Sequence, residues 1–174
     1  MPLSNEMEKK IILSILSILF EFFMDNEEFI CKTPQDTLDL GEKIGESLRG
    51  GEMILLSGGL GAGKTLLTKG ILYALNFDVD EVTSPSFTLV NLYKTEKFDV
   101  FHLDLWRIEE NAAFAVGLDE IIEDETAVTI IEWSERLRNF SFPESVLQIT
   151  IEGDGDEPRR ILTQRRKGAK TQRE

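Results

Sequence analysis

The sequence predicts a three-layer α/β sandwich, in which a mainly parallel central sheet lies between two layers of helices. An apolar run at residues 53–56 leads into a glycine-rich segment and then into an amphipathic stretch, which is the order strand, loop, helix. A second apolar run at residues 127–131 ends at an acid and is typical of a buried parallel strand. The chain has 174 residues and no internal repeat, so we expect a single domain.

The first half of the chain contains clear boundary signals. Thr33 is expected to cap a helix over residues 34–48, because a proline follows it at the first helical position. Two glycines then mark a turn before a strand over residues 52–57. The aliphatic spacing of residues 66–75 predicts the next helix. Residues 76–88 lack strong periodicity and are expected to form a loop.

The second half is richer in strands. Residues 89–93 and 98–103 are separated by a short polar turn, which predicts an antiparallel hairpin. Helical patches are expected at residues 109–116 and 118–123, before the strand at residues 127–131.

The sheet is expected to close near the C-terminus. Ser134 is expected to cap a short helix through Leu137, which Pro143 ends. Strands over residues 146–151 and 160–162 then flank a glycine-containing turn.

The two ends of the chain differ in composition from the middle. Residues 1–23 are interpreted as an N-terminal extension, either an extra helix or a start-site artefact. The apolar stretch at residues 11–24 contains Glu21 and is shorter than the roughly 20 residues that a membrane-spanning helix needs. Residues 24–164 are expected to form the folded domain, and residues 165–174 a basic disordered tail.

The composition restricts the class of partner. The formal net charge is −13, which argues against a surface that wraps broadly around nucleic acid and favours protein partners. The one cysteine, Cys31, cannot form an internal disulfide, which fits a reducing compartment. We therefore expect a cytoplasmic protein that does not bind a membrane.

A phosphate-binding motif follows the strand at residues 52–57. The pattern G-x-x-x-x-G-K-[ST] is matched in full by Gly58, Gly59, Leu60, Gly61, Ala62, Gly63, Lys64 and Thr65. Glycines let backbone amides surround a phosphate, and the helix that follows adds partial positive charge at its N-terminus. Lys64 supplies a mobile cation, and the hydroxyl of Thr65 is a hard oxygen ligand suited to Mg²⁺. The motif in this context predicts a P-loop NTPase fold that binds a nucleotide.

Two acids follow apolar strands. Asp104 comes directly after residues 100–103, and Glu132 comes directly after residues 128–131. Ligands bind at the carboxyl ends of strands in open α/β sheets, so both acids are candidate catalytic residues and Mg²⁺ ligands. The competing interpretation is an ordinary acid that faces water at the end of a strand.

A hydroxyl-rich loop and two tryptophans are further candidates. The loop can act as a switch segment ordered by the third phosphate, or it can be a simple turn. Its candidate residues are Thr83, Ser84, Pro85, Ser86 and Thr88. Trp106 and Trp133 each lie close to an acidic candidate and can either form an aromatic wall for the base or fill the core.

The basic candidates are less specific. Arg159 is a candidate nucleotide contact, as are Arg107, Arg136 and Arg160, although surface ion pairs explain most such arginines. His102 alternates with apolar residues on a predicted strand and is expected to be a hydrogen-bonded structural residue and not a catalytic one.

The motifs, in order, resemble those of the TsaE family over residues 33–162. The segments that carry the resemblance are L-L-S-G-G-L-G-A-G-K-T, T-S-P-S-F-T-L-V, F-H-L-D-L-W-R, G-L-D-E and I-I-E-W-S-E-R. The resemblance implies a small cytoplasmic ATPase in bacterial synthesis of threonylcarbamoyladenosine in tRNA. It also implies ATP and Mg²⁺ as cofactors and the proteins TsaD and TsaB as partners, with tRNA contacted through the complex.

The same resemblance assigns roles to residues. Lys64 and Thr65 would hold phosphate and Mg²⁺, Asp104 and Glu132 would be the acidic pair near the metal, and residues 83–88 would be the switch-like loop. The chain departs from the family pattern where Gly59 replaces Asp, Ser86 replaces Thr, Trp106 replaces Tyr and Ser134 replaces Pro. The departure at Gly59 removes a carboxylate beside the phosphates, which can alter catalytic rate or metal dependence.

Two other functions compete with the ATPase. In a small-molecule P-loop kinase, Asp104 would act as base toward a substrate hydroxyl. In a binding module, ATP would serve only as an assembly signal. A GTPase is disfavoured because the chain lacks the N-K-x-D element for guanine.

Overall fold

The computed structural model describes Met7 and residues 24–108, 117–137, 140, 142, 145–155 and 158–167. Its strands are β1 Glu28–Cys31, β2 Met53–Gly58, β3 Val90–Lys94, β4 Asp99–Asp104, β5 Val128–Glu132, β6 Ser145–Glu152 and β7 Arg159–Lys167. Its helices are α2 Pro34–Ser47, α3 Lys64–Tyr73 and α4 Leu118–Ile122, with 3-10 turns η1 Val79–Glu81 and η3 Ser134–Arg136.

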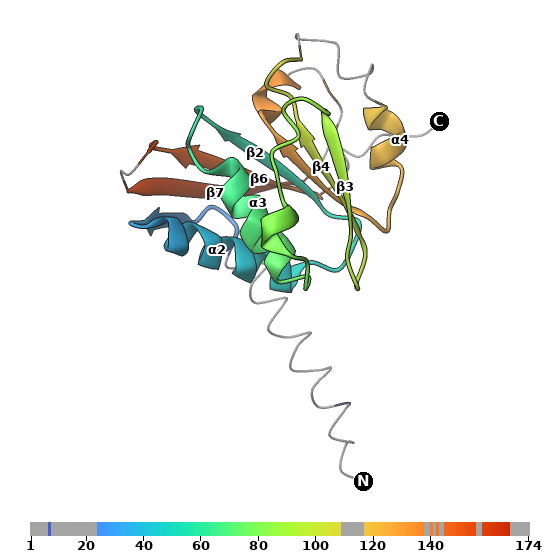
Figure 1. The fold of residues 1–174 in the computed structure, drawn as a ribbon, viewed down its shortest axis with the longest axis horizontal. Coiled ribbons are helices and arrows are strands. Elements are labelled where there is room, and N and C mark those ends of the chain that lie inside the picture. Colours follow the sequence, from blue (N-terminus) through green and yellow to red (C-terminus); the bar gives the residue numbers. More distant parts are fainter. Residues whose placement is uncertain are drawn as a thin grey trace.

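The strands form one sheet in the order β1-β7-β6-β2-β5-β4-β3 (Figure 1). The four inner strands β6, β2, β5 and β4 are parallel to one another. The flanking pairs β1–β7, β7–β6 and β4–β3 are antiparallel. The predicted parallel centre and the β3–β4 hairpin are therefore both confirmed.

Alternating side chains of β2 fill a core on each face of the sheet. Ile54 and Leu56 belong to the core that α2 and α3 cover, whereas Met53 and Leu55 belong to the core that includes Leu118 of α4. These four residues of β2 are all buried, as expected for a central strand covered on both faces. Figure 1 shows α2 and α3 on one side of the sheet and α4 on the other, which confirms the three layers.

The start of α2 agrees with its sequence signal. Thr33 Oγ1 accepts a hydrogen bond from the amide of Asp36 at 3.2 Å, and Asp36 Oδ2 accepts one from the amide of Thr33 at 2.9 Å. This reciprocal pair is a capping box, with Pro34 at the first helical position. The backbone hydrogen bond from Thr33 is the main reason that the pKa of Asp36 lies below its usual value.

Glycines bring α2 and α3 into close contact. A Cβ atom on Gly41 would overlap the carbonyl oxygen of Leu67, and one on Gly70 would overlap the carbonyl oxygen of Leu38. The two helix backbones therefore touch where side chains normally separate helices. This contact fixes the position of α3, whose N-terminus carries the phosphate-loop lysine.

The first strand is absent from the sequence prediction. β1 has four residues and pairs with β7 only, so its length and composition give little signal. Arg160 on β7 holds it through an ion pair, with Nη2 lying 2.8 Å from Glu28 Oε2. Contacts of this kind across the sheet are not visible in the local sequence.

Two predictions near the C-terminus are wrong. β7 extends to Lys167, so residues 165–167 pair with β6 and do not belong to a tail. Backbone pairing decides this, and the polarity of the side chains misled the prediction. A short helix is present where predicted, as the 3-10 turn η3, but Ser134 is its first residue and not its cap, because Trp133 holds the cap position with φ 59° and no side chain caps the turn.

Several expectations concern other parts of the chain. The predicted helix at 109–116, residues 1–23 apart from Met7, and residues 168–174 lie outside the described residues. Within the described part, no helix combines the length and the apolar character needed to cross a membrane.

Candidate functional site

The phosphate motif forms the connection between β2 and α3. Gly58 and Gly63 both have positive φ, at 146° and 106°. A Cβ on Gly58 would lie 2.5 Å from the carbonyl oxygen of Ile151, and one on Gly63 would lie 2.9 Å from Arg159 Nε. No side chain caps the N-terminus of α3, so its first amides keep their hydrogen-bonding capacity for an anion.

Lys64 is buried beneath the loop. Its side chain is 5% exposed, and its Nζ donates to the carbonyl oxygens of Gly58 and Gly59 at 2.8 Å each. The same ammonium lies 3.9 Å from the centre of the Trp133 ring, a cation–π contact. Burial lowers the pKa of Lys64, and the negative charge of Glu132 opposes that shift.

The two acidic candidates lie side by side. Asp104 on β4 is in register with Glu132 on the adjacent parallel strand β5, and both side chains are buried. Thr65 Oγ1 donates to Glu132 Oε1 at 2.8 Å, which joins the first turn of α3 to the end of β5. The strand ends thus bring both carboxylates to the edge of the sheet that carries the phosphate loop.

Asp104 is connected to the hydroxyl-rich loop. Its Oδ2 accepts a hydrogen bond from Ser84 Oγ at 2.6 Å, and its Oδ1 accepts one from the amide of Trp106 at 2.9 Å. Thr83 and Thr88 bond instead to side chains of β3. The carbonyl oxygen of Pro85 accepts from the amide of Leu89, which tightens the end of the loop. Of the five candidate loop residues, Ser84 is therefore the one bonded to an acid.

A cavity of about 390 Å³ lies among these groups. It is lined by Leu60, Gly61, Gly63, Lys64, Thr65, Leu66, Ser84, Ser86, Asp104, Trp106, Arg107, Glu132 and Trp133. The volume is in the range of small-molecule sites, and the lining brings cationic, hydroxyl and carboxylate groups together.

The tryptophans form one wall of this cavity. The ring centres of Trp106 and Trp133 lie 4.4 Å apart with planes inclined at 44°. Arg107 also lines the cavity, and its guanidinium carbon lies 4.3 Å above the ring centre of Phe87. Both tryptophans therefore line the cavity, and Lys64 lies against the ring of Trp133.

Arg159 lies outside the cavity lining and supports the phosphate loop. It is 6% exposed, its Nε donates to the carbonyl oxygen of Ala62 at 2.8 Å, and its Nη2 donates to that of Gly155 at 2.9 Å. These bonds connect the loop to the turn between β6 and β7. The contacts favour a supporting role over the predicted direct contact with nucleotide. Arg136 and Arg160 also lie outside the lining.

His102 is a buried, hydrogen-bonded residue as predicted, but the sequence analysis did not predict its partner. This fully buried side chain places Nε2 2.8 Å from Glu132 Oε1, so it contacts an acid of the site. One signal was available, because residues two apart on a strand share a face and His102 precedes Asp104 by two.

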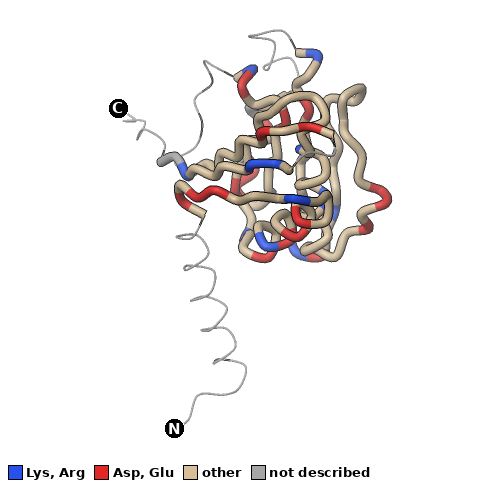
Figure 2. Tube along the Cα trace, turned by 90° about the vertical axis from the view of Figure 1, so that its left-hand side faces the viewer, with Lys and Arg blue, Asp and Glu red and all other residues tan. Residues whose placement is uncertain are grey.

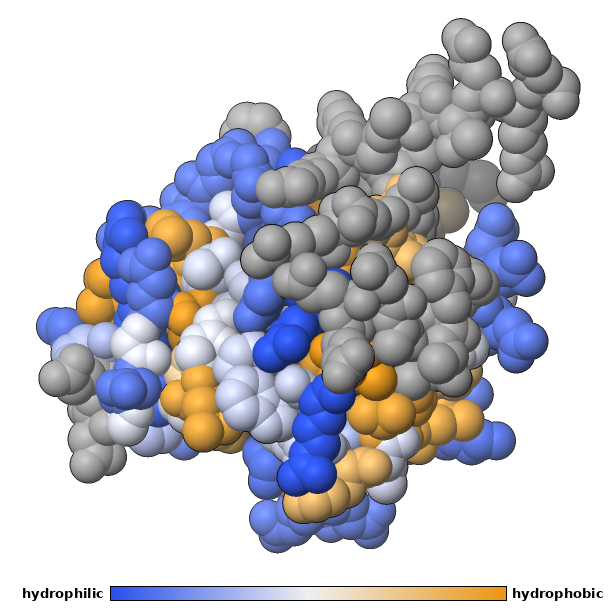
Figure 3. Space-filling view, turned by 90° about the horizontal axis from the view of Figure 1, so that it is seen from above, coloured by the Kyte–Doolittle hydropathy of each residue, from blue (hydrophilic) through white to orange (hydrophobic). Residues whose placement is uncertain are grey.

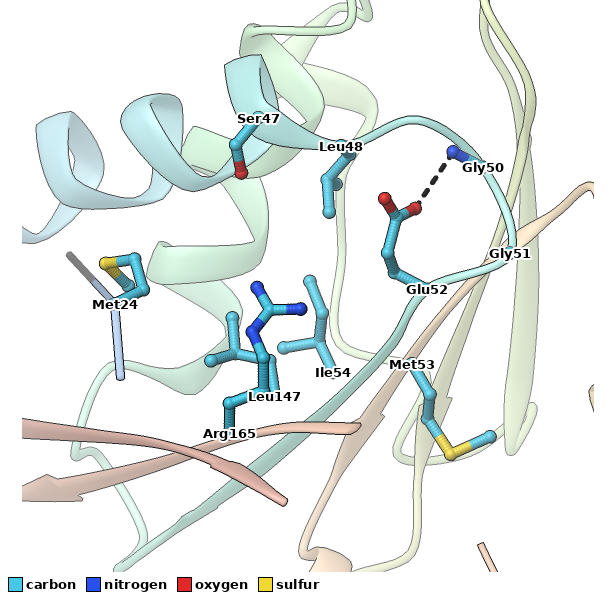
Figure 4. A pocket seen from close by; sticks show the side chains of 10 residues that line it. All are labelled: Met24, Ser47, Leu48, Gly50, Gly51, Glu52, Met53, Ile54, Leu147 and Arg165. Atoms are coloured by element: carbon cyan, nitrogen blue, oxygen red, sulfur yellow. Dashed lines mark hydrogen bonds between the residues drawn. The ribbon is translucent and has the colours of Figure 1, made fainter. Parts of the chain in front are cut away.

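A second cavity lies at the opposite end of β2 (Figure 4). It has a volume of about 130 Å³, and its walls include Met24, Leu48 and Arg165. Glu52 at its rim accepts hydrogen bonds from the amides of Arg49 and Gly50 at 2.8 and 2.9 Å, so it stabilises the turn before β2. This cavity contains none of the phosphate-loop residues.

The described residues hold no group of three or more His, Cys, Asp and Glu side chains that could bind a metal ion by themselves. The oxygen donors that line the cavity include the hydroxyl of Thr65 and the carboxylates of Asp104 and Glu132. Hard oxygens in this number suit Mg²⁺, which usually completes its shell with water and phosphate oxygens.

Known proteins resemble this chain in sequence. A family model described as "Threonylcarbamoyl adenosine biosynthesis protein TsaE" matches residues 31–162. A protein from Nostoc, named tRNA threonylcarbamoyladenosine biosynthesis protein TsaE, is 42% identical over 59% of this chain and 65% of its own length. The protein of the same name from Aquifex aeolicus is 39% identical over 63% of this chain and 78% of its own length.

A solved structure shows the same fold. The crystal structure of YdiB from Bacillus subtilis superposes with a TM-score of 0.64 at 28% identity, covering 80% of this chain and 86% of that one. The family match spans both acids, the phosphate loop and the hydroxyl-rich loop. As the motifs predicted, the chain belongs to the TsaE family and has the P-loop NTPase fold.

Proposed function

We propose that this chain is the Mg²⁺-dependent ATP-binding and ATP-hydrolysing component of tRNA threonylcarbamoyladenosine synthesis, acting with TsaD and TsaB in the cytoplasm. The observation that carries the proposal is the shared cavity of the phosphate loop, Thr65, Asp104 and Glu132. Family membership supplies the pathway, because the relatives carry its name.

The binding step uses the loop and the start of α3. Free amides at the helix N-terminus and the ammonium of Lys64 can neutralise the phosphates of ATP. Thr65, Asp104 and Glu132 would hold Mg²⁺, which when bound neutralises charge on the transferred phosphate. Trp106 and Trp133 offer flat apolar surface to the base.

Hydrolysis requires a carboxylate that positions water near the last phosphate. Asp104 and Glu132 both line the cavity, and neighbouring side chains hold each in place. Among the described residues, Arg107 is the arginine that lines the cavity, and it already contacts Phe87. We therefore expect slow turnover by the isolated chain and faster turnover when partner proteins complete the site.

The surface around the cavity supports a protein partner. Leu60 and Phe87 are 74% and 81% exposed, although both are large apolar residues. Figure 2 shows acidic and basic residues interspersed along the described chain. Contact with tRNA through the partner proteins is consistent with this distribution.

The test is phosphate release with and without TsaD and TsaB. We expect the partners to raise turnover, and Glu132→Ala or Asp104→Ala to reduce the stimulated rate far more than ATP affinity. Glu123→Ala, an exposed change outside the cavity, is the control. Fast turnover by the isolated chain, or transfer of phosphate to a small metabolite, would instead favour the kinase.

A further inference from the structure

His102 is a buried polar residue that one strand presents to another. It lies on β4, is fully buried, and reaches across to Glu132 at the end of β5. With the Glu132 carboxylate ionised, Nε2 of the ring is the donor in this 2.8 Å contact. The ring therefore forms a hydrogen bond with Glu132, which lines the cavity, although His102 does not line the cavity itself.

The two oxygens of Glu132 are used differently. Oε1 accepts from both Thr65 Oγ1 and His102 Nε2, each at 2.8 Å. Within the described chain, Oε2 accepts no hydrogen bond from protein, although Glu132 lines the cavity. The carboxylate is thus held through one oxygen, and the other is the one available to a ligand.

The other ring nitrogen shows that His102 does not simply fill space. Nδ1 is buried and has no hydrogen-bond partner among the described residues. A buried polar atom without a partner lowers stability, and an aliphatic side chain at this position would avoid that cost. Val100, on the same face of β4, is an ordinary apolar core residue. The loss of stability at His102 is explained if its Nε2–H holds Glu132 in position at the site.

We infer that His102 is a positioning residue that holds Oε1 of Glu132 so that Oε2 faces the nucleotide and its metal ion. The inference rests on the proposed function, because it assigns a role within that site. Thr65 contributes the second restraint on Oε1 but is itself a candidate metal ligand. His102 is the restraint that needs no rearrangement when a ligand arrives.

The kinetic test compares His102→Leu with His102→Gln. Leucine removes the donor, and we expect kcat with TsaD and TsaB to fall about 10- to 100-fold while ATP affinity by calorimetry changes little. Glutamine can place an amide N–H near the position of Nε2 and should restore most of kcat. Val100→Ala is the control, since it opens a cavity in the same strand and should lower stability without changing kcat.

A spectroscopic test needs no turnover. His102 is the only histidine in the chain, so ¹⁵N-labelled histidine gives imidazole signals from this residue alone. We expect the tautomer protonated at Nε2, and a clear shift of its signal in Glu132→Gln. A ring protonated at Nδ1, or a spectrum unchanged by Glu132→Gln, would overturn the inference even if His102→Leu fails to fold.

The outcomes separate the two proposals. If the wild-type chain binds no ATP by calorimetry, the proposed function fails. If ATP binding is normal but His102→Leu keeps its kcat, or glutamine does not restore a lost kcat, only the positioning role is rejected.

Discussion

At the scale of single residues, the site is a set of buried polar groups that hold one another. Thr65 and His102 share one oxygen of Glu132, while Ser84 and the amide of Trp106 hold Asp104. Each carboxylate is therefore fixed before a ligand arrives, which lowers the cost of reorganisation during a reaction.

Lys64→Ala should weaken ATP binding by about 1.5–3 kcal/mol, because it removes a charge-assisted contact to phosphate. Lys69→Ala on the same helix is the matched control, since Lys69 lies outside the cavity lining. Calorimetry measures both affinities, and circular dichroism checks the fold. Unchanged affinity in a folded Lys64→Ala protein would contradict the assignment of the phosphate loop.

Two adjacent glycines should respond differently to alanine. At Gly58, φ is 146° and a Cβ would meet the carbonyl oxygen of Ile151 at 2.5 Å, so Gly58→Ala should distort the loop and reduce ATP affinity. At Gly59 the position of a Cβ has no neighbour within 4 Å, so Gly59→Ala should be tolerated. Calorimetry on the two variants tests the loop geometry, and equal losses of affinity would refute it.

The sequence could predict where these residues lie in the fold, but not which groups their side chains contact. Strand periodicity and the position of each acid after an apolar run were sufficient to put Asp104 and Glu132 at one edge. The Arg159 side chain bonds to the carbonyl oxygens of Ala62 and Gly155. These contacts depend on the position of β7 and of the turn at Gly155. The contact of His102 with Glu132 likewise depends on the strand order, which local sequence does not encode.

At the scale of elements, some helix and strand positions follow from local sequence and others depend on contacts with distant residues. The capping box of α2 involves only the four consecutive positions from Thr33 to Asp36, so the start of the helix was predictable from local sequence. β1 exists because β7 lies beside it, and η3 begins after a left-handed Trp133. β1, a four-residue strand with little local signal that depends on β7, was missed by the sequence analysis.

The contact between α2 and α3 leads to a prediction at this scale. Gly70→Ala would ordinarily stabilise a helix by about 0.5–1 kcal/mol, yet its Cβ would overlap the carbonyl oxygen of Leu38. We expect a net loss of about 1–3 kcal/mol from overpacking. Urea denaturation measures it, with the exposed Lys43→Ala on α2 as control. A stabilised Gly70→Ala protein would show that the helices are not in close contact.

At the scale of the whole molecule, the described sheet has a hydrophobic core on each of its two faces. Its cores on both faces draw on residues from Met24 to Ile161. On the face seen in Figure 3, hydrophobic residues lie in patches separated by hydrophilic ones.

Deleting residues 1–23 should leave a folded protein that binds ATP with unchanged affinity. The reason is that Met24, which is 1% exposed in the core, and β1 are both retained. Deleting residues 1–31 removes both and is the contrasting variant, expected to lose stability in a thermal melt. If the shorter deletion already aggregates or loses ATP binding, the domain boundary at residue 24 is wrong.

The adjacent, mutually tilted tryptophans give this protein its own optical reporter. The chain contains two tryptophans in all, and both lie on the wall of one cavity, with Lys64 Nζ 3.9 Å from the ring centre of Trp133. Ultraviolet emission excited at the indoles therefore originates entirely from this site. A cation in contact with an indole perturbs that emission, so movement of Lys64 toward a phosphate should change its intensity. The arrival of a nucleotide can thus be followed in real time on the unlabelled, unmodified chain.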